Sequence, residues 1–196
     1  MGLEINFIEP VGDERGKCDQ ESIFDYVESL ATQKAKSIVG EVPPNSYVFG
    51  SDTVVYFEDQ VIGKPLDKRD ALKTLRNLSG TSHSVITAIS GYDITNDLII
   101  KDFVETKVYM RDFDDIEIRA YVESRDPMDK AGSYAIQNDL FYPVKEIKGC
   151  YFSVVGLPVC AFSKILTRLK LESIIDVDRN QPDFTKCTKC VMLGPV

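Results

Sequence analysis

The sequence predicts a single α/β domain, because strand-like segments alternate with amphipathic helical segments along most of its length. The chain has 196 residues, of which 43% are hydrophobic, and this is enough for one sizeable core. No internal repeat and no compositionally biased stretch interrupts the alternation. We therefore predict one folded unit over residues 1–172, followed by a tail at 173–196 that lacks sustained periodicity.

The first third of the chain predicts a strand, a helix and a hairpin. Loose alternation over residues 3–8 indicates a short strand, and apolar residues at helical spacing over 20–36 indicate an amphipathic helix with Asp19 as its N-cap. Residues 47–57 are rich in β-branched and aromatic types, which is typical of a buried strand. A tight turn after this strand then leads into a short returning strand at 61–62.

The remaining elements follow the same alternation. We expect Asp67 to cap a helix that ends at Gly80, because an apolar stripe lies between them. Further segments are predicted from periodicity and from Pro or Gly boundaries: strands at 83–89 and 98–110 joined through Gly91 and Asn96, a helix at 114–124, a loop leading into a strand at 129–137, strands at 140–144 and 151–155, and a helix at 158–171.

Charge and cysteine content restrict the class of protein. A formal net charge of -8 disfavours non-specific binding of nucleic acid, so an anionic ligand would need local lysines, backbone N–H groups or a metal. No run approaches the roughly 18 apolar residues of a membrane span, and the first residues do not resemble a secretory signal. Five cysteines at irregular spacing favour free thiols in a reducing compartment. We expect a cytoplasmic protein without a membrane or nucleic-acid partner.

Several catalytic signatures are absent from the sequence. It has no Walker loop, no G-x-G-x-x-G, no G-x-S-x-G and no H-E-x-x-H. Its one histidine, His83, cannot form a histidine-rich metal site and is interpreted as a hydrogen-bonded structural residue. Cys187 and Cys190 supply only two of the four ligands of a structural zinc site, so a zinc module is a remote alternative to a free tail. Chemistry based on carboxylates, lysines and metal remains.

Asp52 is the leading catalytic candidate. It interrupts an apolar strand between Phe49 and Val54, where a carboxylate is costly to bury without a cation, a metal or hydrogen-bond donors. A capped turn between two strands, without catalytic role, is the competing interpretation. Lys64 lies between a glycine that allows close approach of a ligand and a proline that stiffens the loop. For Lys64, Lys130 and Lys34, an ordinary solvated surface lysine is the alternative.

Five segments, taken in order, form one pattern. They are Ser51-Asp52-Thr53-Val54-Val55, Gly63-Lys64-Pro65, Leu78-Ser79-Gly80 with His83-Ser84-Val85-Ile86-Thr87, Asp126-Pro127-Met128-Asp129-Lys130-Ala131-Gly132-Ser133-Tyr134-Ala135-Ile136-Gln137, and Val154-Val155-Gly156-Leu157-Pro158. Each segment alone is weak, but their order and spacing are specific, and together they resemble the Maf family of nucleotide pyrophosphatases. The resemblance runs from about residue 3 to residue 171.

The resemblance implies a fold, a reaction and a set of roles. The fold would be a two-lobed mixed sheet with flanking helices around a central cleft, related to inosine triphosphatase, and such proteins commonly form homodimers. The reaction would cleave a nucleoside triphosphate, dTTP or UTP by the Tyr-Ala-Ile-Gln string, into the monophosphate and pyrophosphate with a divalent metal, Mg²⁺ or Mn²⁺. The implied roles are as follows: catalysis by Asp52, metal binding by Asp52 and Glu14, phosphate neutralisation by Lys34, Lys64 and Lys130, and positioning of the nucleotide by Thr53 and Gln137.

The sequence departs from the family pattern at its start and near its third lysine. Family members carry a first strand ending in a Ser-x-Arg-Arg loop that binds the triphosphate, whereas this sequence begins at what resembles the second strand. Arg15 is too isolated to replace that loop, and Asp126 stands where Glu is usual. The departures leave two alternatives open: an active pyrophosphatase, or a catalytically impaired nucleotide-binding or regulatory protein that keeps the fold.

Overall fold

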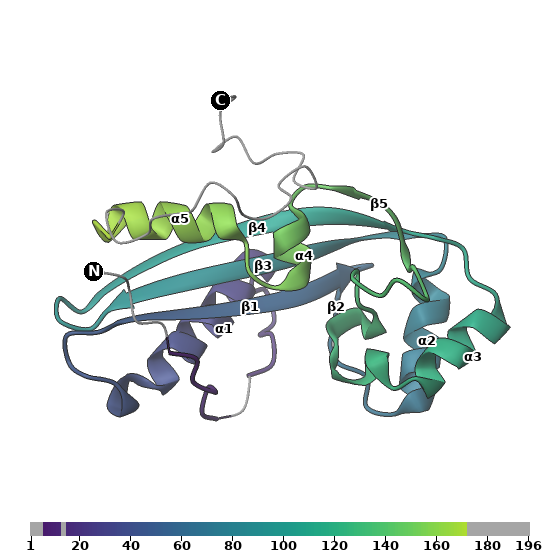
Figure 1. Ribbon diagram of the computed structural model, residues 1–196, viewed down its shortest axis with the longest axis horizontal. Helices are drawn as coiled ribbons and strands as arrows, with labels where there is room; N and C mark the ends of the chain where they lie inside the picture. The colour runs from purple at the N-terminus through teal and green to yellow at the C-terminus, as the bar shows by residue number, and fades with distance from the viewer. Residues whose placement is uncertain (1–5, 13–14, 172–196) are drawn as a thin grey trace.

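The computed structural model describes residues 6–12 and 15–171, which form one long sheet with helices on both of its faces (Figure 1). The sheet has five strands in the order β2-β1-β3-β4-β5, and each of the four pairings is antiparallel. The α/β class is therefore confirmed, although no parallel pairing occurs among the described strands. The strands are β1 (Tyr47–Phe57), β2 (Gln60–Ile62), β3 (Ser82–Asp93), β4 (Leu98–Met110) and β5 (Val144–Lys148).

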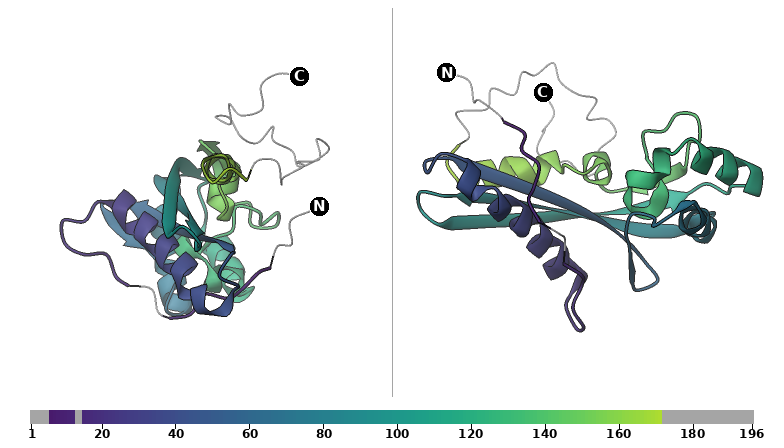
Figure 2. Two further views of the ribbon diagram at one scale, coloured as in Figure 1. Left: turned by 90° about the vertical axis from the view of Figure 1, so that its left-hand side faces the viewer. Right: turned by 90° about the horizontal axis from the view of Figure 1, so that it is seen from below.

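The helices divide between the two faces and one end of the sheet. Helix α1 packs against β1 and β3, whereas α4 and α5 lie over the opposite face (Figures 1 and 2). Helices α2 and α3 pack together at the far end of the sheet. The bounds are α1 (Ile23–Ser37), α2 (Lys68–Leu78), α3 (Asp115–Glu123), α4 (Tyr151–Val155) and α5 (Val159–Arg168), with short turns of 3₁₀ helix at η1 (Val39–Glu41), η2 (Asp126–Asp129) and η3 (Ala131–Ser133).

Three clusters of buried side chains hold these layers together. The largest lies under α2 and α3 and includes Leu75, Val108 and Ile118. A second fixes α1 on β1 and β3, and a third fixes α5 on the other face of the sheet. The core at the α2 and α3 end and the core beneath α1 thus give two lobes that share one sheet.

Gly50 brings α1 unusually close to β1. A Cβ atom at this position would lie 2.3 Å from the carbonyl oxygen of Ala31 and 2.5 Å from the backbone nitrogen of Ala35, both in α1. Backbone atoms in the middle of a helix cannot move aside as a flexible side chain can. Because alternate residues of a strand face the same side, Asp52 points toward α1 as Gly50 does. The close approach therefore places α1 within reach of Asp52.

Many sequence-based predictions of the elements are confirmed. Helix α2 begins after Asp67, whose side chain accepts a hydrogen bond from the backbone nitrogen of Asp70. The strand at 98–110 has the expected bounds, and the returning strand of the hairpin after β1, predicted at 61–62, spans Gln60–Ile62. Helix α3 lies within the predicted 114–124, and α5 within 158–171. Long or strongly periodic segments were therefore predictable.

Other predictions of elements are wrong. Residues 151–155 form α4 rather than a strand, because Gly156 adopts a left-handed φ of 112° that caps a helical turn. The strand predicted at 140–144 is displaced to β5, and the segment 129–137 contains 3₁₀ turns rather than leading into a strand. The N-cap of α1 is Ser22, not Asp19, and β3 continues through Gly91. Residues 6–8 form no strand, and residues 3–5 and the tail at 173–196 lie outside the described residues.

A Gly50→Ala substitution should destabilise the protein by about 1 to 3 kcal/mol, because the added methyl group has to displace the α1 backbone. Urea denaturation followed by circular dichroism measures the change. Gly40→Ala is the matched control, since a Cβ there meets nothing within 4 Å. Equal stability of the two variants would contradict the close packing of α1 on β1.

Candidate functional site

A cavity of about 560 Å³ lies beside β1, between α1 and the loop that follows η3. Six segments contribute to it. They are α1, the middle of β1, the end of β2 with Gly63 and Lys64, β3 at Val85, the stretch from Lys130 to Gln137, and the end of α4 at Val154 and Val155. Within the described chain, β2 pairs only with residues 55–57 of β1, so no strand covers the edge of β1 along the cavity.

Asp52 lies in the wall of this cavity and is 5% exposed. Its carboxylate forms an ion pair with the ammonium group of Lys34, which α1 presents to the cavity together with Tyr26 and Leu30. These three α1 residues are spaced by four, so they lie on one face of the helix. A buried carboxylate is tolerated when a cation accompanies it, and Lys34 is such a cation.

Lys64 and Lys130 line the same cavity from the other lobe. The backbone N–H of Gly132 donates a hydrogen bond to the carbonyl oxygen of Gly63 at 3.1 Å, which joins the two loops that carry these lysines. Gly132 has a left-handed φ of 72°, a conformation that favours glycine. The structure therefore brings Asp52 and the three predicted lysines to one cavity.

The ammonium group of Lys130 is held by its own neighbours. It donates to the carbonyl oxygen of Asp126 at 2.8 Å and to a carboxylate oxygen of Asp129 at 2.7 Å. Burial lowers the pKa of Lys130, but the two carboxylates outweigh burial and hold the pKa above its ordinary value. Lys130 is thus a positive charge in a fixed place, whereas the Lys64 side chain is exposed.

Thr53 and Gln137 also line the cavity, in different environments. Thr53 follows Asp52 in β1, so its side chain points to the opposite face, where its hydroxyl lies 2.9 Å from that of Thr87. Gln137 is exposed at the end of the loop after η3. The cavity thus reaches both faces of the sheet at the edge of β1. Glu14, the remaining predicted site residue, lies outside the described residues.

Tyr134 connects the cavity wall to the single histidine. Its hydroxyl lies 2.7 Å from Nε2 of His83, and the His83 side chain is fully buried. Burial, with a smaller effect of Lys107, lowers the pKa of His83 to about 4, so the ring is neutral at pH 7. The expectation of a hydrogen-bonded structural histidine agrees with this geometry.

The described side chains of the cavity can supply only some of the ligands of a divalent cation. Among residues 6–12 and 15–171, no three His, Cys, Asp or Glu side chains form a group able to bind a metal. Magnesium, however, is commonly bound by one or two carboxylates together with substrate phosphates and water. Asp52 can supply one such carboxylate, so the described residues fit a cation that enters together with a phosphorylated substrate.

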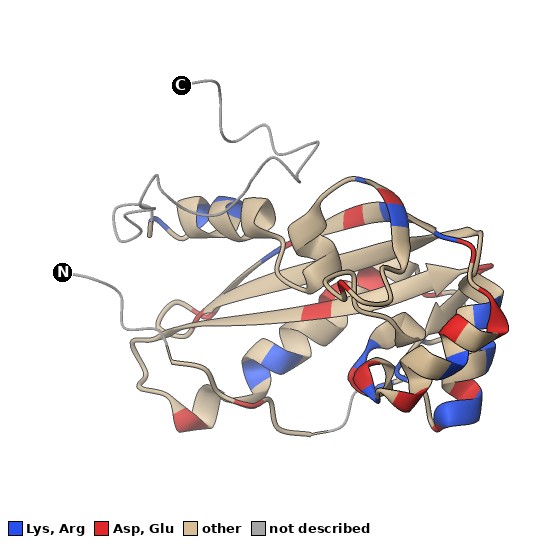
Figure 3. Cartoon of the chain, turned by 45° about the vertical axis from the view of Figure 1, so that its right-hand side comes forward, with Lys and Arg blue, Asp and Glu red and all other residues tan. Residues whose placement is uncertain are grey.

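Charges elsewhere on the surface are interspersed, and acidic and basic residues mix over the helices at the α2 and α3 end (Figure 3). The cavity differs from this pattern, because its described lining contains three lysines and one carboxylate. In a protein of net charge -8, the cavity therefore gathers lysines, of which Lys34 pairs with Asp52 and Lys130 pairs with Asp126 and Asp129. Helices long and apolar enough to cross a membrane do not occur in the described ranges.

Comparison with known proteins agrees with this geometry. Residues 1–169 match the model of the family described as Maf-like protein. A dTTP/UTP pyrophosphatase of Clostridium botulinum (strain Okra / Type B1) is 41% identical over 152 residues, which are 76% of this chain and 78% of the relative. The dTTP/UTP pyrophosphatases of Geotalea uraniireducens (strain Rf4) and Dictyoglomus turgidum (strain DSM 6724 / Z-1310) are 40% and 35% identical over 168 residues, with 86% of each chain covered. The chain belongs to the Maf-like protein family.

Some residues of the cavity were not foreseen from the sequence. Tyr26 and Leu30 line it beside Lys34, and their spacing of four residues was a usable signal. Ser51 connects β1 to β3 and to the end of α4, because its hydroxyl lies within hydrogen-bond distance of the carbonyl oxygens of Ala88 at 3.0 Å and Gly156 at 2.8 Å. No local pattern indicates that contact, since its partners lie 37 and 105 residues away.

The buried His83 should make folding stability sensitive to pH. Its folded pKa lies below that of an exposed histidine, so the unfolded chain binds the proton more tightly, and stability falls as the pH drops from 6.5 toward 4. The expected slope from this group is about 1.4 kcal/mol per pH unit. Urea denaturation at pH 7 and pH 5 should show a smaller loss for His83→Gln than for wild type. Equal losses would contradict a buried neutral ring.

Proposed function

We propose that this protein hydrolyses dTTP and UTP to the nucleoside monophosphate and pyrophosphate. The support is twofold: membership of the Maf-like family, with relatives named dTTP/UTP pyrophosphatase at 35–41% identity, and the geometry of one cavity. The observation that carries it is the buried Asp52 carboxylate beside Lys34, in a cavity that Lys64 and Lys130 also line. A carboxylate among cations is suited to activating water for attack on a polyphosphate.

In this mechanism, the lysines bind the triphosphate and Asp52 guides the nucleophile. Lys34, Lys64 and Lys130 bring three positive charges toward a substrate that carries several negative ones. Binding of phosphate oxygens by Lys34 competes with its ion pair to Asp52, and this leaves the carboxylate available to accept a proton from water. Attack on phosphorus needs such positioning and charge stabilisation rather than a covalent protein nucleophile.

A divalent cation, Mg²⁺ or Mn²⁺, belongs to the proposal. When bound, it would neutralise charge on the phosphates and polarise them as a Lewis acid. Asp52 would hold it together with the substrate, and we assign the same role to Glu14 on the family resemblance. The described residues themselves do the rest: they attract the triphosphate, fix its orientation and hold the proton acceptor in a nearly dry wall of the cavity.

Thr53 and Gln137 are proposed to position the nucleotide. Both line the cavity, and they lie on segments that differ from those of the three lysines. The side-chain amide of Gln137 can both donate and accept a hydrogen bond, as the edge of a thymine or uracil ring requires. A homodimer and a cytoplasmic location remain predictions from the family resemblance and from the cysteine content.

A nucleotide-binding regulatory protein without catalysis is the second candidate. One observation favours it: the described lining of the cavity contains lysines but no arginine. Lysine is a point charge, whereas arginine makes paired hydrogen bonds to phosphate, so orientation of the triphosphate by the described residues is less restrictive. This candidate predicts nucleotide binding in the absence of pyrophosphate release.

Asp52→Asn should lower kcat for dTTP hydrolysis by about 100-fold or more, because the amide cannot accept the proton from water. The assay measures pyrophosphate released in the presence of Mg²⁺ or Mn²⁺. Asp93→Asn is the matched control, since Asp93 is 6% exposed, like Asp52, but does not line the cavity. Thermal unfolding of both variants separates a catalytic loss from a loss of folding.

Pyrophosphate release that survives Asp52→Asn unchanged would remove Asp52 from the mechanism. Wild-type protein that binds a non-hydrolysable dUTP analogue but releases no pyrophosphate would support the regulatory candidate instead. Wild-type protein that shows neither binding nor release would contradict both.

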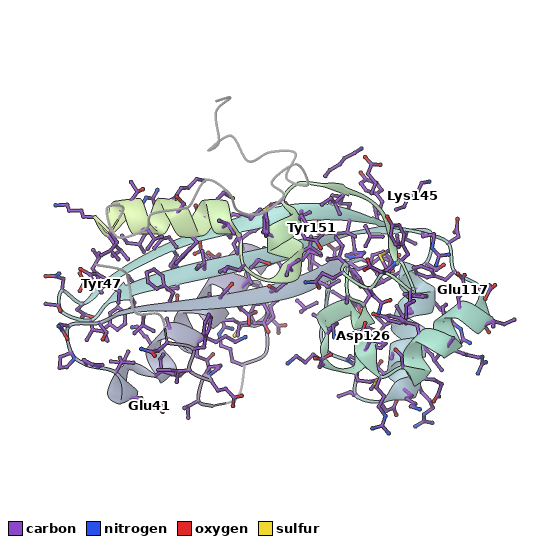
Figure 4. All side chains as sticks on the ribbon, in the orientation of Figure 1. Glu41, Tyr47, Glu117, Asp126, Lys145 and Tyr151 are labelled. Carbon is purple, nitrogen blue, oxygen red and sulfur yellow. The ribbon has the colours of Figure 1, made fainter. Side chains whose placement is uncertain are left out.

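Lys64→Ala should raise KM for dTTP roughly tenfold, because a charge-assisted contact to phosphate is lost. The increase should shrink in high salt, since screening weakens the same contact in the wild type. Lys145→Ala is the control, because Lys145 is exposed on β5 and does not line the cavity (Figure 4). Steady-state kinetics at two ionic strengths test both points, and an equal KM for the two variants would exclude Lys64 as a phosphate contact.

A further inference from the structure

Asp126 connects three segments behind the cavity wall. One carboxylate oxygen, Oδ2, accepts hydrogen bonds from the hydroxyl of Tyr121 at 2.5 Å and from the amide of Asn138 at 3.1 Å. The other oxygen, Oδ1, lies 3.2 Å from the ammonium group of Lys130. Figure 4 shows Asp126 on the side of the α2 and α3 end that faces α1. A single carboxylate thus joins helix α3, Lys130 and the end of the loop after η3.

Tyr121 extends this connection to the wall of the cavity. Its hydroxyl donates to Asp126 and accepts a hydrogen bond from the backbone N–H of Ala135 at 3.0 Å. Ala135 belongs to the stretch from Tyr134 to Gln137 that lines the cavity. The hydrogen bonds therefore form an unbroken chain from the Lys130 ammonium, through Asp126 and Tyr121, to the backbone of this stretch. Asn138, which directly follows Gln137, closes the loop by its own bond to Asp126.

Packing and charge keep this chain in one arrangement. The Tyr121 ring is 5% exposed and stacks on Phe141, with centroids 4.1 Å apart and planes inclined by 12°. Burial and the bond to Asp126 raise the pKa of Tyr121, so its hydroxyl remains a donor. Burial also raises the pKa of Asp126, but the bonds from Tyr121 and Lys130 outweigh it and keep the carboxylate ionised. The bond from the Ala135 N–H to the Tyr121 hydroxyl is buried, which strengthens it relative to a bond exposed to water.

We propose that Asp126 and Tyr121 are positioning residues that hold Lys130 and the stretch from Ala135 to Gln137 in a fixed spatial relation. Lys130 then contacts the phosphates, while Gln137 contacts the nucleoside end of the same substrate. The spacing between Lys130 and Gln137 is therefore set by Asp126 and Tyr121, whose side chains do not touch the substrate. This inference rests on the proposed function, because it requires that Lys130 and Gln137 contact a nucleotide. It adds two residues that act only through those contacts.

A purely electrostatic role and a positioning role for Asp126 predict opposite changes in KM for the Asp126→Asn variant. Asp126→Asn removes one negative charge from the neighbourhood of a polyanionic substrate, and electrostatics alone would lower KM. Loss of positioning raises KM instead, because asparagine has one acceptor oxygen in place of two. Its NH2 group then faces either the Lys130 ammonium or the donors Tyr121 and Asn138. The sign of the change in KM therefore separates the two roles.

The test compares variants of the full chain by steady-state kinetics with dTTP. Tyr121→Phe and Asp126→Asn should each raise KM roughly tenfold with kcat changed less than about threefold, as expected for a lost hydrogen bond that orients binding residues. Asp126→Glu, which keeps the charge, should restore KM to within about threefold of wild type. Tyr92→Phe is the control, because it removes a Tyr–Asp hydrogen bond of 2.7 Å to Asp97. Both residues belong to the β3–β4 hairpin, whose turn lies at the end of the sheet away from α2 and α3 (Figure 1).

Thermal unfolding of each variant shows whether the fold survives, and calorimetry with a non-hydrolysable dUTP analogue gives the dissociation constant independently of catalysis. A tenfold weaker binding by Tyr121→Phe and Asp126→Asn, but not by Tyr92→Phe, would support positioning even in a wild type that releases no pyrophosphate. Active wild type with unchanged KM in both variants, or a lowered KM in Asp126→Asn, would overturn this inference alone. A wild type that neither hydrolyses nor binds would overturn it together with the proposed function.

Discussion

The buried ion pair between Asp52 and Lys34 is the interaction on which the site depends. Burying a carboxylate that is 5% exposed in an apolar strand is costly without a partner of opposite charge or hydrogen-bond donors, and α1 supplies such a partner in Lys34. That pairing requires α1 to lie against β1, and Gly50, two residues before Asp52 on the same face, removes the side chain that would hold them apart. The Asp52–Lys34 ion pair at the cavity wall therefore depends both on the alternation of side chains along β1 and on the close packing of α1.

The second lobe completes the cavity through loops rather than through the sheet. The hydrogen bond from Gly132 to Gly63 joins the loop that carries Lys130 to the loop that carries Lys64, and the left-handed φ of Gly132 allows that approach. Lys64 and Lys130 thus line the same cavity as Asp52, although the protein as a whole is acidic. A small polyanion finds its complement in the cavity, while the outer surface does not favour polyanions in general.

Sequence patterns predicted the features that depend on residues close together in the chain. An apolar stripe with Asp67 as its cap predicted α2, and apolar periodicity predicted α3. The cost of a carboxylate in an apolar strand singled out Asp52. The segment 151–155 was mistaken for a strand because a short apolar run fits either element, and its contacts with β3 and β4 decided in favour of a helix. The hydrogen bonds of Asp126 with Tyr121, and of Tyr121 with Ala135, were not predictable, because their directions arise only once α3 and the loop after η3 are packed.

The most direct measurement is a crystal structure of the protein with Mg²⁺ and a non-hydrolysable dUTP analogue. If the buried carboxylate guides water onto phosphorus, the triphosphate lies in the cavity among Lys34, Lys64 and Lys130, and one water molecule separates its α-phosphorus from Asp52. A triphosphate bound elsewhere on the protein, or an α-phosphorus that faces away from Asp52 with no water between them, would contradict that role.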